Sequence, residues 1–501
     1  MITEEEFKEL ARTYSVVPLV ETMLADLHTP VSIYLSLRSN LSPSFLLESV
    51  EPDEKIGRYS FVGTDPLLLV KAKGDVIEIE SGSKKEQRHG KVIDVLEEYS
   101  RQYRNVAIQE QQGFAGGFLG YYGYDRVQEI EKVPFHPPAK GDAPDAMFGL
   151  YHVVVKFDHL HQLMTVTCNC ILDQQRPLSE QYHEGKRKLE SMFIQLGKSP
   201  STENTFHCDS SSMEQSGDRE TFCNSVRRAK EYIHEGDIFQ VVLSRRIQLP
   251  FSGDPFPVYR ALRIINPSPY LFYLDFQSVK LIGASPEVLV RVQKDIVSVM
   301  PIAGTRKRGK TSEEDIRLGE ELLSDQKELA EHVMLVDLGR NDVGRVSEFG
   351  SVHVSVFKHL RRFSHVMHIV SEVQGKIKAG AKSLDALRAC FPAGTVSGAP
   401  KVRAMEIIHE LEPVRRGIYA GAVGYFGFDG ALDTCIAIRT IVAANGMLTI
   451  QAGAGIVADS VPELEYKETE NKAQVLLDAL HAASNGLRKV HNENGHAEGQ
   501  K

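Results

Sequence analysis

The 501-residue chain contains no tryptophan, only six cysteines and no long apolar run. The cysteines are scattered and form no Cys-x-x-Cys pair, which excludes a disulfide-rich secreted scaffold and indicates a reducing cytoplasm. Apolar runs such as residues 153–155 are far too short to span a bilayer. Residues 1–6 lack the basic segment of a signal peptide. Chance composition explains the missing tryptophan as well as any function would.

Positive charge is not in excess either. The chain has 58 Lys and Arg against 67 Asp and Glu, a formal net charge of −9. This balance argues against nucleic acid or an anionic membrane surface as the main partner. It does not exclude a small anionic substrate, because a local basic site can lie on an acidic protein.

A Ser-rich, polar stretch divides the sequence. Residues 199–218 have no apolar periodicity, so they predict a linker or long loop between an N-terminal region, 1–198, and a C-terminal region, 219–484. The polar residues 485–501 predict a flexible tail.

Both regions mix strands and helices, so an α/β (α+β) protein is expected. Residues 419–428, 432–443 and 447–451 predict consecutive strands joined at Asp429-Gly430 and Asn445-Gly446. Such short turns imply antiparallel pairing, which excludes a doubly wound nucleotide-binding sheet. Helical spacing is clearest in residues 312–336 and 464–482.

The Gly/aromatic pattern of residues 117–125 returns at residues 421–429 with the same spacing. An ancient duplication of a sheet unit and convergence on a similar strand are both open explanations.

Four glutamates occur in two pairs on the two predicted helices. Glu328 and Glu331 on the first, and Glu465 and Glu468 on the second, are each spaced i, i+3, so each pair lies on one helical face. Carboxylates from two helices, with no Cys/His cluster nearby, favour Mg²⁺ over a transition metal. Solvated surface is the common alternative for such spacing. The apolar neighbours of Glu331 argue for burial instead, and buried carboxylates need partners.

Two glycine-containing segments and one arginine indicate possible anion sites. Residues 391–401 form a Gly/Ser/Thr loop that leads into a helix near Pro400, and residues 451–456 follow a strand. Neither has the spacing of a Walker A loop or a dinucleotide fingerprint. Arg439 lies in an otherwise apolar segment, so it requires a carboxylate from either the protein or a substrate.

These segments together resemble the family of chorismate-utilising enzymes, which includes the anthranilate, aminodeoxychorismate, isochorismate and salicylate synthases. The resemblance rests on residues 301–306, 337–342, 391–401 and 455–473, which occur in family order. It implies a sandwich of antiparallel sheets with helices packed outside. Residues 46–49 and 57–61 resemble the members that work with an amidotransferase.

The resemblance also implies a role for each matching residue. It implies Mg²⁺ on Glu331 and Glu468, with Glu328 and Glu465 completing the shell, and Glu287 as the general acid on the departing C4 hydroxyl. The ring would be lined by His368 and Thr395, and the two chorismate carboxylates would be held by Tyr419, Arg439, Gly453, Ala454, Gly455 and Lys472. A carboxylic acid suits this reaction because hydroxide is a poor leaving group.

Two positions discriminate among the members. Isochorismate and salicylate synthases resemble this chain but carry a lysine base at the position of Gln240, and an amide cannot take a proton at neutral pH. Aminodeoxychorismate synthases typically carry a nucleophilic lysine at the position of Ala303. The sequence therefore predicts formation of anthranilate and pyruvate, with aminodeoxychorismate synthesis as the alternative. A non-catalytic, ligand-sensing homologue is a second alternative, against which the complete set of site residues argues.

The resemblance further implies partners and an inhibitor. No cysteine lies in a Gly-x-Cys-x-Gly glutaminase motif, so ammonia is expected from a separate glutamine amidotransferase subunit, in a heterotetramer of two large and two small subunits. Alone, the chain should use only ammonium salts. A pocket for tryptophan, as feedback inhibitor, is implied by Glu48, Ser49, Pro269, Tyr270 and Leu271. A strand-edge role for Glu48 is the alternative.

Overall fold

The computed structural model describes residues 1–50, 57–103, 113–138, 141–198, 205–362 and 366–487. Parts of the predicted linker (199–204) and of the predicted tail (488–501) lie outside the described residues. None of the described helices is both long enough and apolar enough to cross a membrane.

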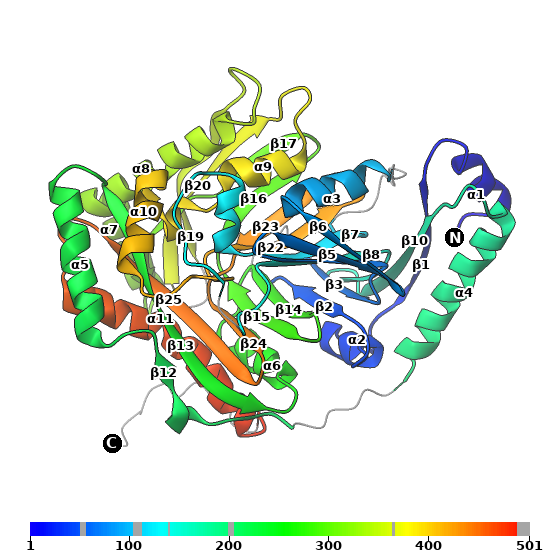
Figure 1. The fold of residues 1–501 in the computed structure, drawn as a ribbon, viewed down its shortest axis with the longest axis horizontal. Coiled ribbons are helices and arrows are strands. Elements are labelled where there is room, and N and C mark those ends of the chain that lie inside the picture. Colours follow the sequence, from blue (N-terminus) through cyan, green and yellow to red (C-terminus); the bar gives the residue numbers. More distant parts are fainter. Residues whose placement is uncertain (51–56, 104–112, 139–140, 199–204, 363–365, 488–501) are drawn as a thin grey trace.

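Two large sheets form the centre of the molecule, and helices cover their outer faces (Figure 1). The pairings between neighbouring strands are antiparallel, as the hairpin turns predicted. The first sheet runs in the order β1-β10-β9-β3-β2-β14-β15-β24-β25-β13-β11, with β12 and β21 also paired to β13. The second runs β18-β20-β17-β16-β23-β22-β7-β8-β4-β5-β6, with β19 paired to β20. The predicted fold class is thus confirmed.

The strands of the first sheet are β1 (Val16–Leu24), β2 (Ser44–Glu48), β3 (Tyr59–Thr64), β9 (Val153–Asp158), β10 (Leu163–Ile171), β11 (His207–Cys208), β12 (Glu214–Gln215), β13 (Gln240–Ser252), β14 (Tyr270–Asp275), β15 (Val279–Ser285), β21 (Gly398–Ala399), β24 (Thr440–Ala444) and β25 (Met447–Ile456). Those of the second are β4 (Leu68–Lys73), β5 (Val76–Ser81), β6 (Lys84–His89), β7 (Gly117–Tyr122), β8 (Ala146–Tyr151), β16 (Val288–Gln293), β17 (Ile296–Val299), β18 (Ile302–Lys307), β19 (His353–Arg362), β20 (Val366–Lys376), β22 (Ala422–Gly427) and β23 (Leu432–Ile436).

The described helices are α1 (Glu4–Leu10), α2 (Pro30–Leu37), α3 (Val92–Arg101), α4 (Leu178–Leu196), α5 (Arg219–His234), α6 (Phe256–Ile265), α7 (Ser312–Ser324), α8 (Gln326–Gly344), α9 (Ser383–Cys390), α10 (Lys401–Leu411) and α11 (Pro462–Ser484). Short 3-10 turns are η1 (Tyr124–Glu129), η2 (Ser210–Ser212) and η3 (Gly394–Val396).

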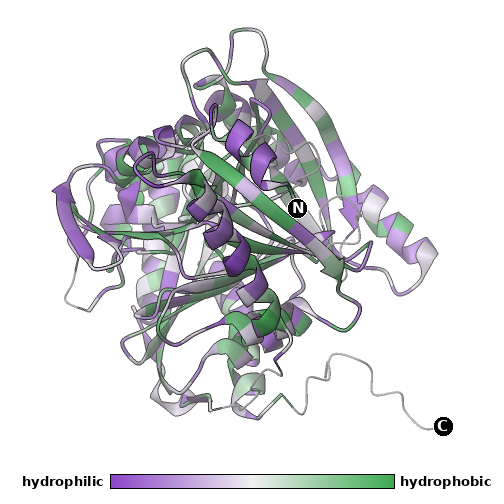
Figure 2. Cartoon of the chain, turned by 90° about the vertical axis from the view of Figure 1, so that its right-hand side faces the viewer, coloured by the Kyte–Doolittle hydropathy of each residue, from purple (hydrophilic) through white to green (hydrophobic). Residues whose placement is uncertain are grey.

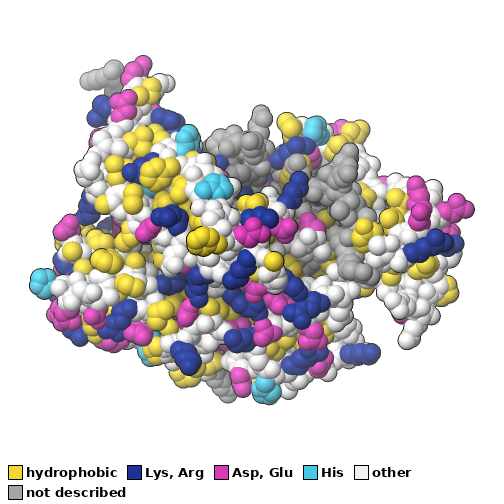
Figure 3. Space-filling view, turned by 90° about the horizontal axis from the view of Figure 1, so that it is seen from above, with side chains coloured by type: hydrophobic (Ala, Val, Ile, Leu, Met, Phe, Trp, Pro, Cys, Tyr) yellow, Lys and Arg dark blue, Asp and Glu magenta, His cyan; other side chains and the backbone are white. Residues whose placement is uncertain are grey.

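Three apolar layers hold the sandwich together. An aromatic layer that includes Phe45, Tyr151 and Phe272 lies between the sheets. A second layer packs the first sheet against α1, α2, α4, α6 and α11, and a third packs the second sheet against α3, α8 and α9. Figure 2 shows hydrophobic and hydrophilic residues alternating along these elements, as expected when one face of each is buried. In the view of Figure 3, basic and acidic side chains are intermixed over the surface.

Both sequence regions contribute strands to both sheets. The first sheet joins them where β2 pairs with β14, and the second where β7 pairs with β22. The boundaries 1–198 and 219–484 therefore remain predictions about sequence regions, while the sheets and their cores are shared. The repeated Gly/aromatic segments are the neighbours β7 and β22, in which Gly120 is paired with Gly424. A side chain at either position would strike backbone carbonyl oxygens, which explains the glycines.

Two sequence expectations about element boundaries are corrected. The single helix expected over residues 312–336 is two helices, α7 and α8, which are separated at Asp325. The single strand expected over residues 432–443 is β23 in the second sheet and β24 in the first. Between them Arg439 adopts a positive φ of 51°, where the chain crosses from one sheet to the other.

Candidate functional site

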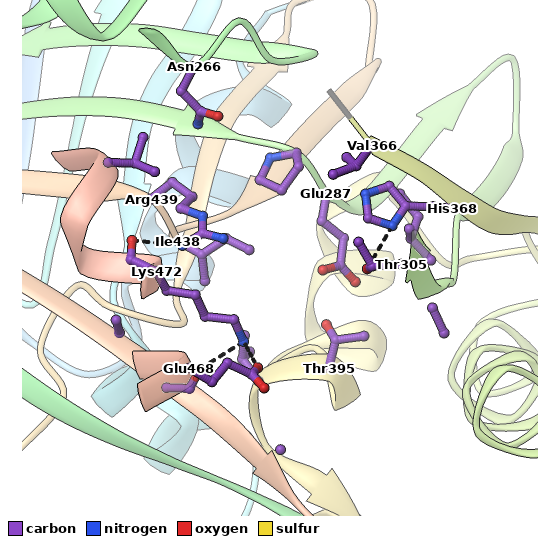
Figure 4. Close-up of a pocket in the computed structure, with 18 of the residues that line it drawn as sticks. Asn266, Glu287, Thr305, Val366, His368, Thr395, Ile438, Arg439, Glu468 and Lys472 are labelled. Carbon is purple, nitrogen blue, oxygen red and sulfur yellow. Dashed lines mark hydrogen bonds and ion pairs between the residues drawn. The ribbon is translucent and has the colours of Figure 1, made fainter. Parts of the chain in front are cut away.

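A cavity of about 1910 Å³ opens where strands of both sheets meet α8 and α11 (Figure 4). Its wall comes from β13 and β25 of the first sheet, β18 and β20 of the second, the turn η3, and both helices. The predicted site residues that line it are Glu287, Glu331, His368, Thr395, Tyr419, Arg439, Gly453, Gly455, Glu465, Glu468, Lys472 and Pro269. The discriminating residues Gln240 and Ala303 line it too.

Glu287 is the titratable group in this cavity that is best suited to hold a proton near neutral pH. It follows the end of β15, where its backbone accepts a hydrogen bond from Ile436 N at 3.1 Å. Burial raises the pKa of Glu287 to about 7, and the side chains of Thr395 and Lys472 partly oppose the rise. Figure 4 shows the Thr395 hydroxyl facing this carboxyl group. Within the described residues that buried hydroxyl makes no hydrogen bond of ordinary geometry.

His368 lies on β20, on the far side of Glu287 from Lys472 (Figure 4). Its Nδ1 lies 2.9 Å from the carbonyl oxygen of Gly304 and 3.1 Å from Oγ1 of Thr305. Burial lowers the pKa of His368, so the ring is neutral near pH 7. With Nδ1–H donating to Gly304, the other ring nitrogen is an acceptor, and the imidazole orients a partner rather than protonates it.

Arg439 and Tyr419 form the opposite wall. Arg439 Nη1 donates to the carbonyl oxygen of Lys472 at 2.7 Å, and in the described part of the chain no carboxylate forms an ion pair with this guanidinium. Burial lowers the pKa of Arg439, whereas Tyr419 and Glu468 oppose that change. Burial also raises the pKa of Tyr419 to about 12, so its hydroxyl stays a donor. A partly buried cation that forms no ion pair with a protein carboxylate is suited to an anionic ligand.

The carboxylates of α8 and α11 face one another across the cavity. The pKa of Glu331 is raised by burial and then by Glu328 and Glu468; the pKa of Glu465 is raised by burial and by Glu468. Lys472 Nζ lies 2.5 Å from Glu468 and donates to Gly453 O at 2.9 Å. Such mutual repulsion fits a hard cation among oxygen ligands. The described residues contain no preformed cluster of three metal-binding side chains.

Glu328 differs from the other three glutamates. It lies 3.0 Å from Arg306 in an ion pair and does not line the cavity. Its predicted metal role would therefore require that this pair open. Ala454 also differs, because its side chain packs in the apolar cluster with Ile407 while its neighbours Gly453 and Gly455 line the cavity. The two glycines are needed for close approach, since a Cβ would lie 2.6 Å from the Tyr419 hydroxyl or 2.8 Å from Gln240 Nε2.

The five residues of the predicted tryptophan pocket are only partly brought together. Glu48 is paired in register with Leu271, but its buried carboxylate already accepts hydrogen bonds from Arg263 at 2.8 and 3.0 Å and from Tyr259 at 2.6 Å. Tyr270 donates to Asp433 at 2.6 Å. Ser49 carries a buried hydroxyl with no hydrogen-bond partner in the described chain. Pro269 lines the large cavity instead.

Sequence reasoning missed several residues of the cavity and its support. Thr305 contacts His368, Arg306 holds Glu328, and Gln451 lines the wall. Arg306 belongs to a motif that was noticed, but its partner is 22 positions away, so spacing alone gives no signal. Helix α10 begins at Lys401, in agreement with the start expected near Pro400.

Comparison with known proteins agrees with this geometry. The family described as chorismate binding enzyme matches residues 42–478. Anthranilate synthase component 1 of Acetivibrio thermocellus is 44% identical over 494 residues, covering 96% of this chain and 98% of that protein. The corresponding protein of Aquifex aeolicus is 45% identical over 483 residues, covering 96% and 97%.

Solved structures give the same result. The crystal structure of anthranilate synthase component I from Streptococcus pneumoniae has a TM-score of 0.73 and 36% identity, covering 91% of this chain and 99% of that one. The menaquinone-specific isochorismate synthase of Escherichia coli shares the fold, with a TM-score of 0.69 at 19% identity, covering 95% and 100%. The chain therefore belongs to the chorismate-binding enzyme family and, within it, to the anthranilate synthase component 1 group.

Proposed function

We propose that this chain is the chorismate-converting component of an anthranilate synthase, forming anthranilate and pyruvate from chorismate and ammonia for tryptophan biosynthesis in the cytoplasm. The observation that carries the proposal is one cavity that holds both a carboxyl group of pKa about 7, Glu287, and a partly buried guanidinium, Arg439, which forms no ion pair with a carboxylate of the described residues. Relatives of this name at 44–45% identity over nearly the full length support it.

Glu287 supplies the proton for the first step. A ring hydroxyl leaves as water only when it is protonated, and a carboxylic acid with a pKa near 7 is half protonated at neutral pH. The neutral His368 and the hydroxyl of Thr395 lie on either side of this acid and orient the ring. At a fixed concentration of free ammonia, activity should fall as the pH rises above about 7, because the acid loses its proton.

Arg439, with Tyr419 as a hydroxyl donor, is suited to hold the enolpyruvyl carboxylate. A guanidinium and a phenol place their donors at fixed positions, so the ring is kept in register with Glu287. Lys472 and the backbone of Gly453 and Gly455 lie toward the acidic cluster and would neighbour the ring carboxylate.

Mg²⁺ fits the carboxylates of Glu331, Glu468 and Glu465, which repel one another in the described structure. When bound, the ion supplies charge stabilisation at the conjugated carboxylate as the double bonds shift. Glu328 would join only after it leaves Arg306. The chain's own residues hold the substrate and move its proton.

Gln240 and Ala303 argue for ammonia as the nucleophile. Gln240 carries a buried amide, which cannot activate water as a base, and the methyl group of Ala303 offers no amine for covalent attack. Both line the cavity, so space remains for a small amine. Aminodeoxychorismate synthesis is the alternative, in which pyruvate is not released.

A separate glutamine amidotransferase subunit would supply the ammonia, in an assembly of two large and two small subunits. Tryptophan is proposed as the feedback inhibitor, bound near Glu48 and Ser49. Because Glu48 is paired with Arg263, tryptophan would have to displace that pair for its amino group to reach the carboxylate. A titration of tryptophan against Glu48→Gln would test this: inhibition should weaken in the variant and stay in the unchanged chain.

Product analysis tests the main proposal. The purified chain, with chorismate, Mg²⁺ and ammonium at mildly alkaline pH, should give anthranilate and pyruvate by mass spectrometry and fluorescence. Glutamine should not replace ammonium. Aminodeoxychorismate without pyruvate would move the enzyme to the alternative reaction. Isochorismate would contradict the argument from Gln240, and no product under saturating conditions would favour a ligand-sensing homologue.

A further inference from the structure

We propose that the buried ion pair of Arg416 and Glu412 is a positioning device that holds three parts of the cavity wall in place: the turn that carries Thr395, the ring of Tyr419, and strand β13 beside Gln240. This inference rests on the proposed function for its kinetic consequence. Its structural consequence can be measured without turnover.

The pair is enclosed and its geometry is bidentate. Arg416 Nε donates to Glu412 Oε2 at 2.9 Å, and Nη2 donates to Oε1 at 2.7 Å. The side chains are only 1% and 4% exposed. Replacing a buried pair of this kind with apolar residues is often neutral or stabilising, so stability alone does not account for two desolvated charges.

The remaining donors of Arg416 reach two wall segments. Nη1 donates to the carbonyl oxygen of Val396 and Nη2 to that of Val242, both at 2.6 Å. Val396 is the last residue of the turn η3, next to Thr395, and Val242 is on β13, two residues after Gln240. Only a planar guanidinium can serve a carboxylate and two carbonyls in these directions.

The guanidinium also lies against an aromatic wall. Its central carbon is 5.5 Å from the ring centre of Tyr419 and 4.7 Å from that of Tyr124. Contacts at these distances are cation–π interactions that fix ring positions. Tyr419 lines the cavity, so the same cation that holds η3 also supports the opposite wall.

Glu412 extends the support to a fourth segment. Its Oε1 accepts hydrogen bonds from Ser244 N at 2.7 Å and Ser244 Oγ at 2.8 Å. Gln451 Nε2 in turn donates to Ser244 Oγ at 2.8 Å, and Gln451 lines the cavity on β25. The pair thus reaches cavity residues of η3, β13 and β25 without touching the cavity itself.

A displaced turn would have a measurable effect on Glu287. The hydroxyl of Thr395 faces the Glu287 carboxyl and keeps its pKa lower than burial alone would set it. If η3 moves because Arg416 no longer holds Val396 O, this effect is lost. The pKa of Glu287 should then rise. The Thr395 side chain, which is proposed to orient the ring, should also be displaced.

The test compares Arg416→Lys and Glu412→Gln with Arg415→Lys. Arg415 is the matched control, because it is the adjacent buried arginine and pairs with Asp125 and Asp145 at 3.1 and 2.7 Å, away from the cavity. Infrared titration of the Glu287 carboxyl, assigned by subtracting Glu287→Gln in each background, gives the pKa directly. Steady-state kinetics with chorismate and ammonium give kcat and KM.

We expect a higher Glu287 pKa in Arg416→Lys, and a kcat that falls roughly 10- to 100-fold while KM changes less, because small misplacements near reacting atoms have effects of this size. Arg415→Lys should change neither quantity. A folded Arg416→Lys with the wild-type pKa and kcat would overturn the proposal. If this variant does not fold, Glu412→Gln decides by the same readouts. If the unchanged chain forms no anthranilate, the proposed function fails, and the infrared titration still decides this inference.

Discussion

At the scale of single residues, Glu287 links the proposed chemistry to folding stability. Its ordinary pKa is 4.5, and burial raises the pKa to about 7, so the folded chain binds this proton more tightly than the unfolded chain. The contribution of Glu287 to the free energy of unfolding is therefore fully present below pH 4.5 and is lost as the pH rises through about 7. Folding must then bury a carboxylate anion, at a cost of about 3 kcal/mol.

Glu287→Gln removes this cost because an amide does not ionise. We expect the variant to be more stable than the unchanged chain by about 3 kcal/mol at pH 8, with the gain shrinking toward zero as the pH approaches 4.5. Urea unfolding of both proteins at pH 5 and at pH 8 measures the difference in stability. An equal gain at pH 5 and pH 8 would mean that packing, and not proton binding, separates the two proteins.

Replacement by Met is expected to have opposite effects on stability at Arg439 and at Arg415. Arg439→Met removes a partly buried cation that forms no ion pair in the described chain, so stability should not fall. KM for chorismate should rise roughly 10- to 100-fold, because a charged hydrogen bond to the substrate is lost. Arg415→Met removes the ion-pair partner of Asp125 and Asp145, which are both buried. It should therefore lower the free energy of unfolding by about 3–5 kcal/mol. Thermal unfolding and kinetics of both variants test the contrast; a strongly destabilised Arg439→Met would contradict it.

At the scale of elements, the break between α7 and α8 sets the direction of the helix that carries Glu331. Asp325 is the N-cap of α8, accepts hydrogen bonds from the backbone of Lys327 and Glu328, and contacts Arg306 at 2.8 Å. It thereby fixes the first turn of α8, which precedes the turn that carries Glu331. A single continuous helix would aim this carboxylate elsewhere.

Asp325→Ala should lower stability by about 1 kcal/mol and also weaken Mg²⁺ binding, since the first turn of α8 loses its cap. The matched control is Asp218→Ala, which removes the cap of α5 at Thr221 N and does not change a residue that lines the cavity. Calorimetric titration with Mg²⁺ should show weaker binding only in Asp325→Ala. Equal Mg²⁺ affinity in both variants would show that the Asp325 cap does not affect Mg²⁺ binding.

The sequence predicted elements well where the signal is local. Asn445 and Gly446 both have positive φ, as their turn type requires, and the hairpin that they close was predicted. The prediction failed where an apolar segment continues while the chain passes from one sheet to the other. Residues 432–443 look like one strand because both halves are buried, and nothing local marks Arg439 as the crossing point between sheets.

The candidate site shows the same limit. The i, i+3 spacing predicted that each glutamate pair lies on one face of its helix, and Glu331, Glu465 and Glu468 do line the same cavity. The spacing could not show that Glu328 is held by Arg306. The contact of Arg416 with the carbonyl of Val242 joins residues 174 positions apart. Contacts of this kind depend on how the sheets are assembled, so single-sequence patterns do not report them.

At the scale of the whole molecule, the two sheets are each built from both sequence regions. Among the residues that the structure describes, the cavity is lined only by those from Gln240 onward. The sheets that carry them are continued by β2, β3 and β7 to β9 of the N-terminal region. The aromatic layer between the sheets likewise combines Phe45 and Tyr151 with Phe272. Separating the two regions would expose this layer to water.

A protease site inserted within residues 199–204 tests this shared construction. After cleavage the two pieces should remain associated and keep anthranilate formation with ammonium, because the pairings of β2 with β14 and of β7 with β22 are non-covalent and lie elsewhere in the chain. Size-exclusion chromatography and product analysis of the cut protein measure both properties. An inserted site of equal length without the cleavage sequence is the control. Two folded pieces that separate on the column would show that residues 1–198 and 219–484 are independent domains, and that the strand pairings between them contribute little to stability.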